Sequence, residues 1–115
     1  MSDYRYGSIW LINFEPQLGK EIKKTRPGLI ISRTQFNQKR QKITVLPFTS
    51  STSSIGGARI AVSSSDNNGL TKDSQLIVID PATFDKRRFV KYLGVLETEI
   101  IIVMKQKLSL YLNLN

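Results

Sequence analysis

One arginine, Arg26, stands between a polar, basic loop and an apolar run, followed directly by Pro27. Proline fixes its own φ angle and favours an extended backbone at the residue before it. We therefore expect Arg26 to lie at the mouth of a strand and not on a flexible loop. A planar guanidinium group binds phosphate oxygens bidentately, and binding residues concentrate on loops anchored by rigid elements. The stretch of residues 14–32 is thus predicted to form the centre of the functional surface.

The composition limits the chemistry of this surface. The 115-residue chain contains no cysteine and no histidine. It therefore lacks disulfides, thiolate chemistry, the usual general acid–base residue and the commonest metal ligand. Any catalysis must use Arg, Lys, Thr, Ser, Tyr, Asp or Glu side chains.

The chain is strongly basic, with 17 Lys and Arg residues against 9 acidic ones and a net charge of +8. Such a bias favours a polyanionic partner, either a nucleic acid or an acidic protein segment; a purely solubilising charge is the alternative. The N-terminus lacks the apolar core of a signal peptide, and no apolar run reaches membrane-spanning length. We expect one domain over residues 1–115, soluble and cytoplasmic.

Short apolar and β-branched runs predict six strands, at residues 9–12, 29–31, 43–49, 59–62, 75–80 and 91–96. The run 75–80 is the most β-prone and is expected to be central. Pro47 should place the end of its strand at an edge or a bulge. Residues 33–42 are expected to form a surface connection anchored by Phe36, and residues 84–89 a basic turn.

The hydrophobic period changes near the C-terminus. Ile101, Met104, Leu108 and Tyr111 or Leu112 fall on one face of a helix that begins near Thr98, its candidate N-cap. Several strands followed by one helix, without β–α alternation, favour a mainly β (α+β) fold. The expected architecture is a small antiparallel barrel or twisted sheet closed by the C-terminal helix.

Five segments of the sequence resemble, in order and spacing, the MazF/PemK (Kid-like) toxins. They are G-S-I-W-L-I-N-F-E-P-Q-L-G-K-E-I-K-K-T-R-P-G-L-I-I-S at 7–32, T-V-L-P-F-T-S at 44–50, N-G-L-T-K-D-S at 68–74, T-F-D-K-R-R at 83–88, and L-G-V-L at 93–96 before the helix. The resemblance implies an SH3-like β-barrel with a C-terminal helix, usually homodimeric. It also implies a sequence-specific endoribonuclease that cuts single-stranded RNA without a metal or other cofactor. Such toxins of type II toxin–antitoxin systems are held inactive by an acidic antitoxin partner.

The same resemblance suggests three catalytic residues. Arg26, in T-R-P, would offset charge on the scissile phosphate, and Thr49, in P-x-T-S, would donate to a phosphate oxygen. Glu21 would accept a proton or orient Arg26. The alternatives are that Arg26 only pairs with Glu21 and that Thr49 only bonds its own backbone.

Further residues are candidates for binding RNA through their charge, hydroxyl groups or rings. Two basic clusters are expected to face one RNA groove, and Trp10 is expected in the core, while Tyr4 and Tyr6 could stack on bases. The RNA-binding candidates are Lys20, Lys23, Lys24, Ser50, Lys86, Arg87 and, in the same run, Arg88.

The sequence departs from the family pattern at two positions. Lys20 stands where some relatives carry a histidine, and Ala82 stands where many carry an arginine. These departures motivate an alternative hypothesis, a barrel that binds RNA or an antitoxin without cleaving RNA. A structural subunit for an acidic partner is a third hypothesis.

Overall fold

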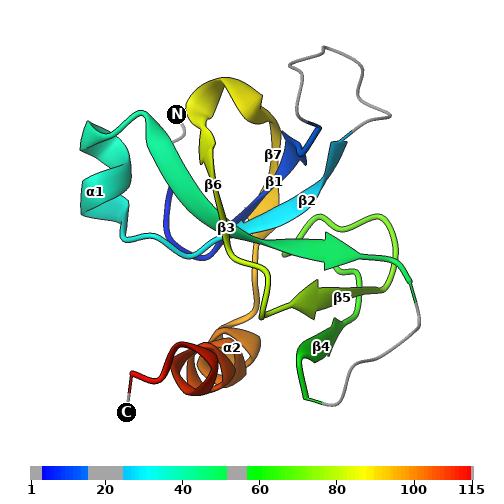
Figure 1. The fold of residues 1–115 in the computed structure, drawn as a ribbon. Coiled ribbons are helices and arrows are strands. Elements are labelled where there is room, and N and C mark those ends of the chain that lie inside the picture. Colours follow the sequence, from blue (N-terminus) through cyan, green and yellow to red (C-terminus); the bar gives the residue numbers. More distant parts are fainter. Residues whose placement is uncertain (1–3, 16–24, 52–56, 115) are drawn as a thin grey trace.

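Seven antiparallel strands and a C-terminal helix make up the described part of the chain (Figure 1). The structure is a computed structural model that describes residues 4–15, 25–51 and 57–114. The strands are β1 (Ser8–Asn13), β2 (Thr25–Ile30), β3 (Lys42–Thr49), β4 (Arg59–Val62), β5 (Ser74–Ile77), β6 (Ala82–Asp85) and β7 (Phe89–Val95), and the helices are α1 (Thr34–Lys39), the 3₁₀ turn η2 (Lys86–Arg88) and α2 (Thr98–Leu112).

The strands follow the order β4-β5-β3-β2-β1-β7, and β6 pairs with β3 beside this path. The outer strands β4 and β7 are not paired with each other, so the described sheet curls without closing into a barrel. In Figure 1, α2 lies below this curled sheet on the side of β4 and β5. The expected mainly β fold with a C-terminal helix is confirmed.

Strand β1, the second half of β2 and the middle of β3 are buried on both faces because their apolar residues do not alternate with polar ones. Ile9 and Leu29 belong to a core cluster that also contains Met104 of α2. Their chain neighbours Trp10 and Ile30 point to the opposite face, since side chains alternate along a strand, and belong to a second cluster.

The pairing of β3 changes halfway along its length. β6 pairs with β3 up to Val45, and β5 pairs with it from Phe48 onward. Pro47, which has no N–H to donate, lies in the gap between these two partners. The pairing with β2 ends at Pro47, through the pair Gly28–Pro47, and the last two residues of β3 pair with β5 alone in the described part of the chain. This one-sided pairing after Pro47 agrees with the expected edge.

Strand β6 was not predicted: Ala82 and Thr83 were assigned to no element, and Phe84 and Asp85 were placed in the basic turn. Ala82 and Thr83 pair with β3, and the turn itself is the short helix η2. The strand predicted at residues 75–80 is β5, which does lie between β4 and β3 but ends at Ile77. There the chain turns, and the Val78 N–H donates to the Ala58 carbonyl at 3.0 Å.

Phe36 does not anchor the connection between β2 and β3, because its side chain is 62% exposed. The buried residue of α1 is Asn37, which is 1% exposed. Its amide donates to the carbonyls of Tyr4 and Ser32, and its Oδ1 accepts from the Ser32 hydroxyl at 2.6 Å. A polar side chain with all these partners can replace an apolar anchor.

The predicted helix is present, and its apolar face packs on the sheet through Ile101, Met104 and Leu108. Tyr111 and Leu112, which we expected on the same face, are 51% and 45% exposed. The N-cap is Glu97 and not Thr98, and its side chain caps no helix N–H. The Glu97 carboxylate instead binds the loop before β5.

This loop is held by a fully buried amide, Asn68, which has 0% exposure. Asn68 Oδ1 accepts from the backbone N–H groups of Ser65 and Leu70 at 3.1 and 3.0 Å. Asn68 Nδ2 donates to the Ser63 carbonyl at 2.9 Å and to Glu97 Oε1 at 3.1 Å. Hydrogen bonds, first from the Ser65 hydroxyl, hold the pKa of Glu97 below its ordinary value.

Two glycines let the same loop lie directly on β7. Gly69 has a φ of +72°, and a Cβ built there would lie 2.1 Å from the Leu93 carbonyl oxygen. A Cβ at Gly94 would lie 2.4 Å from the Asn67 carbonyl oxygen. Neither backbone can move aside at low cost, so any side chain would separate the loop from the strand.

Replacing Asn68 should destabilise the protein strongly. Asn68→Ala leaves two N–H groups and a carbonyl without their partner, and each buried unsatisfied group costs about 1–3 kcal/mol. We expect the free energy of unfolding to fall by about 3 kcal/mol or more in urea denaturation followed by circular dichroism. The matched control is Asn67→Ala, because Asn67 is exposed, donates to the Val95 carbonyl and makes a minor contact with Glu97. It should cost about 1 kcal/mol; equal losses for the two variants would contradict the role of Asn68.

Candidate nucleic-acid interface

A cleft of about 510 Å³ opens where β2, β3 and β7 meet the loop before β5. We call it the Arg26 cleft. Its floor is apolar, with Leu11, Phe48, Leu70 and Leu93, and its walls are polar. The polar lining residues are Thr25, Arg26, Thr49, Ser50, Thr71, Lys72, Ser74 and Lys91.

Arg26 is exposed and is the second residue of β2, where it pairs with Ile12 of β1. The strand begins at Thr25, earlier than predicted, so the arginine is part of the ladder and not merely next to it. Its guanidinium carbon lies 5.8 Å from the centre of the Phe14 ring. Among the described residues no carboxylate forms an ion pair with Arg26.

Thr49 is the last residue of β3 and is half-buried beside the cleft. Its Oγ1 accepts a hydrogen bond from the Ser51 backbone N–H at 3.2 Å. This is the local backbone contact that sequence analysis named as the alternative role. It uses a lone pair of the hydroxyl oxygen and fixes its position, and the hydroxyl hydrogen remains a donor.

The cleft also contains cations that sequence analysis did not select. Lys72 comes from the loop held by Asn68, and Lys91 comes from β7, where it pairs with Leu11. Lys72 lies inside the segment N-G-L-T-K-D-S, which was noted for its resemblance alone, whereas Lys91 had no sequence signal. The described lining thus carries three cations and no carboxylate, an arrangement that attracts anions.

A second cleft, of about 380 Å³, lies beside β6 and η2. We call it the Phe84 cleft, and its lining comprises Phe14, Glu15, Lys42, Thr83, Phe84, Asp85, Arg87 and Arg88. It shares no described lining residue with the Arg26 cleft. Two of the basic residues expected to face the main groove therefore lie in a separate cleft, and Lys86 instead lies 5.0 Å above the Tyr4 ring.

Several other candidates have defined places. Ser50 lines the Arg26 cleft as expected. Trp10 is 7% exposed and belongs to the core, which confirms its expected place, and Tyr4 stacks on it at 4.9 Å. Burial raises the pKa of the Tyr6 hydroxyl, and Tyr6 lines neither cleft. Lys20, Glu21, Lys23 and Lys24 lie outside the described residues.

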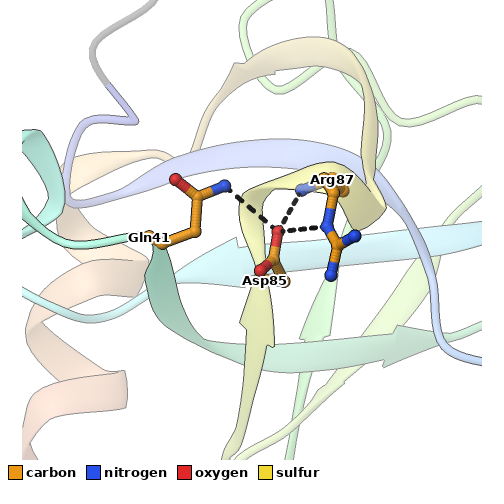
Figure 2. A network of polar contacts seen from close by, with 3 residues as sticks. All are labelled: Gln41, Asp85 and Arg87. Atoms are coloured by element: carbon orange, nitrogen blue, oxygen red, sulfur yellow. Dashed lines mark hydrogen bonds and ion pairs between the residues drawn. The ribbon is translucent and has the colours of Figure 1, made fainter.

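Asp85 organises the turn at the Phe84 cleft (Figure 2). Its Oδ1 accepts from the Arg87 backbone N–H at 2.8 Å, from Arg87 Nε at 3.1 Å and from Gln41 Nε2 at 3.1 Å. The backbone hydrogen bond contributes most to lowering the pKa of Asp85, to about 2. The carboxylate is therefore ionised at all physiological pH values and holds Arg87 in place.

No helix in the described part of the chain is long and apolar enough to cross a membrane. No group of three or more acidic side chains in that part of the chain could hold a metal ion.

Comparison with known proteins identifies the family of this chain. The family model described as "PemK-like, MazF-like toxin of type II toxin-antitoxin system" matches residues 5–112. The chain belongs to this family.

Two curated relatives and a solved structure show the range of similarity. The endoribonuclease PemK of Escherichia coli is 34% identical over 86 residues, which span 75% of this chain and 64% of PemK. The endoribonuclease MazF9 of Mycobacterium tuberculosis is 24% identical over 115 residues, covering 96% of this chain and 97% of MazF9. An endoribonuclease from a Mycobacterial species, solved in complex with its cognate antitoxin, superimposes with a TM-score of 0.77 at 19% identity and covers 96% of each chain. This last similarity shows the fold alone.

The Asp85 network predicts a pH response. Because the pKa in the folded protein is below the ordinary value of 3.8, Asp85 stabilises the fold above that value. This contribution is lost as the pH falls from about 4 through about 2. Carbon-detected NMR titration should give a midpoint near 2 for Asp85. Gln41→Ala and Arg87→Ala should each raise the midpoint without restoring the ordinary value, since the backbone N–H of residue 87 remains. A midpoint near 3.8 in the unmodified protein would contradict the network.

Proposed function

We propose that the protein is a metal-independent endoribonuclease that cuts single-stranded RNA, and that it is the toxin of a type II toxin–antitoxin system. The observation that carries this proposal is the Arg26 cleft, in which three cations surround a hydroxyl side chain without a carboxylate among the described lining residues. The family membership and the endoribonuclease names of the relatives support the same activity.

The proposed reaction uses the substrate's own 2′-hydroxyl group as the nucleophile. A bond forms between the 2′-oxygen and phosphorus, and the bond between phosphorus and the 5′-oxygen breaks. The products are a 2′,3′-cyclic phosphate and a 5′-hydroxyl. One proton must leave the 2′-hydroxyl and one must reach the 5′-oxygen, so that the enzyme has to stabilise charge and assist two proton movements.

Arg26 suits charge stabilisation because its fork can bind two phosphate oxygens at once. Its position in the β2 ladder and against the Phe14 ring keeps it oriented before the substrate binds. Arginine is a poor general base, because its guanidinium group stays protonated in proteins. We assign Arg26 to the phosphate oxygens and to donating a hydrogen bond to the leaving 5′-oxygen.

We assign Thr49 to positioning the scissile phosphate. The Ser51 N–H fixes its oxygen, and the hydroxyl hydrogen can donate to a phosphate oxygen. We retain Glu21 as a candidate proton acceptor from the family resemblance. Lys72 and Lys91 would neutralise the phosphates next to the cleavage site.

We further propose a cytoplasmic location, where messenger RNA is translated, and two protein partners. An acidic antitoxin would compete with RNA for the cations of the Arg26 cleft. Titration of the protein with the acidic protein encoded beside it tests this competition.

A homodimer would cover the apolar side chains at the end of α2, where Leu110 is 71% and Leu112 is 45% exposed. Light scattering in solution distinguishes the dimer from a monomer.

Arg26→Ala should abolish most of the cleavage activity. Removing one preorganised donor to the developing charge lowers the rate by about 10²–10³. The assay is primer extension on a long RNA incubated with the protein in EDTA, which also reveals the position and sequence of the cut. Circular dichroism should be unchanged, because the side chain is exposed.

Arg40→Ala is the matched control, because Arg40 is exposed and lines neither cleft. It removes the same charge and should cut RNA like the unmodified protein. Full activity of Arg26→Ala would refute the assigned role, and an unmodified protein that binds RNA without cutting it would refute the endoribonuclease.

Lys72→Ala and Lys91→Ala should weaken RNA binding and reduce its dependence on salt. Each phosphate contact to a single strand contributes about 0.7 to the slope of log K against log salt concentration. Fluorescence anisotropy with a labelled single-stranded RNA, in a series of salt concentrations, should show that each variant lowers the magnitude of this slope by about 0.7. Lys39→Ala, on α1 and outside both clefts, should keep the slope. If all three variants behave alike, the lysines act only through net charge.

A further inference from the structure

A continuous row of side chains leads from the Arg26 cleft to the Phe84 cleft. The Arg26 guanidinium carbon lies 5.8 Å from the centre of the Phe14 ring. The Phe14 and Phe84 rings pack edge to face with their centres 4.8 Å apart, and the Arg88 guanidinium carbon lies 5.9 Å from the Phe84 ring centre. Within the described residues, the Phe14 and Phe84 rings, which line the second cleft, connect it to Arg26 of the first. A chain bound at Arg26 could pass over these rings into the second cleft.

The Phe84 cleft provides the two kinds of group that bind a nucleotide. Phe14 and Phe84 are both partly exposed, so that an aromatic surface is available for a base. Arg87 supplies a fork for a phosphate. Its Nε is bound by Asp85, and its two terminal nitrogens make no contact with the other residues drawn in Figure 2.

The charges of the second cleft have different tasks. Arg88 Nη1 donates to the backbone carbonyls of Asn13 and Glu15, so that it forms the wall between β1 and η2. Asp85 is paired with Arg87, whose side chain is nevertheless 71% exposed. Arg87 and the exposed Lys42 are therefore the cations that a phosphate can reach.

We propose that the Phe84 cleft is a second subsite that binds a nucleotide of the RNA outside the cleaved step. The base would stack on the Phe84 ring, and the adjacent phosphate would bind Arg87 and Lys42. The inference rests on the proposed function, because it assumes that the chain in the Arg26 cleft is RNA. An acidic peptide would pair with the cations without requiring the aromatic surface. RNA uses both, because its phosphates pair with the cations and its bases stack on the rings, and RNA is therefore the favoured occupant.

The test compares RNA substrates of different length after the cut has been mapped. A short oligonucleotide ends close to the cut, and two longer ones extend it separately in the 5′ and 3′ directions. Because the second cleft lies to one side of Arg26, only one of the extensions should raise kcat/KM, by at least about fivefold for one stacked base. Arg87→Ala and Phe84→Leu should each bring the ratio between long and short substrates close to one. Phe84→Leu removes the ring and keeps apolar volume in the pocket.

Lys39→Ala is the control, since it removes one positive charge at a residue that lines neither cleft and should keep the ratio of the unmodified protein. The subsite is refuted if neither extension raises kcat/KM, or if both cleft variants keep the original ratio. If the unmodified protein cuts no RNA, the proposed function fails. The subsite is then tested by comparing the affinities of the protein for a short and a long oligouridine. Arg87→Ala and Phe84→Leu must lose the preference for the long oligonucleotide; an unchanged preference refutes the subsite.

Discussion

Both clefts depend on the change of partner along β3. The strand is paired with β2 through Pro47, but its other edge is shared by β6 up to Val45 and by β5 from Phe48. A proline at this point cannot donate to a neighbouring strand, so the pairing of one partner ends there and that of the next begins. The two ends of one strand thereby face different surroundings. Thr49 contributes to the Arg26 cleft at one end, and Lys42 contributes to the Phe84 cleft at the other.

The loop before β5 both stabilises the fold and supplies residues to the Arg26 cleft. Asn68 uses both ends of its amide, and Gly69 and Gly94 allow the loop backbone to lie on β7 without a gap. Leu70, which is 5% exposed, then enters the core next to the site, and Lys72 follows on the cleft wall. In the segment N-G-L-T-K-D-S, the first residues therefore hold the loop in place, and Lys72 contributes positive charge to the cleft. A change at Asn68 would disturb the cleft without touching it.

Sequence alone predicted what depends on local pattern. The apolar runs of β1, β3 and β4 and the period of α2 fixed the order of elements, and Pro27 placed Arg26 in an extended segment. β6 was missed because three of its four residues are half-buried, Thr83 is exposed, and this mixed pattern becomes a strand only by pairing with β3. Asn37 was missed for a related reason, since a buried amide is recognised by its partners and not by its type. Lys91 reaches the cleft through the pairing of β7 with β1, which no local pattern encodes.

The lack of histidine shapes how such a cleft can work. Without an imidazole, the chain has no side chain that titrates near neutral pH at its ordinary pKa. A carboxylate, which is ionised at that pH, could still accept a proton, but the described lining of the Arg26 cleft contains none. The described part of the site can therefore stabilise charge and orient the phosphate more readily than it can remove a proton. A fixed guanidinium and two ammonium groups favour the doubly charged phosphorane-like transition state over the singly charged phosphodiester, since the attraction grows with the charge. The same field lowers the pKa of a 2′-hydroxyl held beside it, so that a weak acceptor or water suffices as the base.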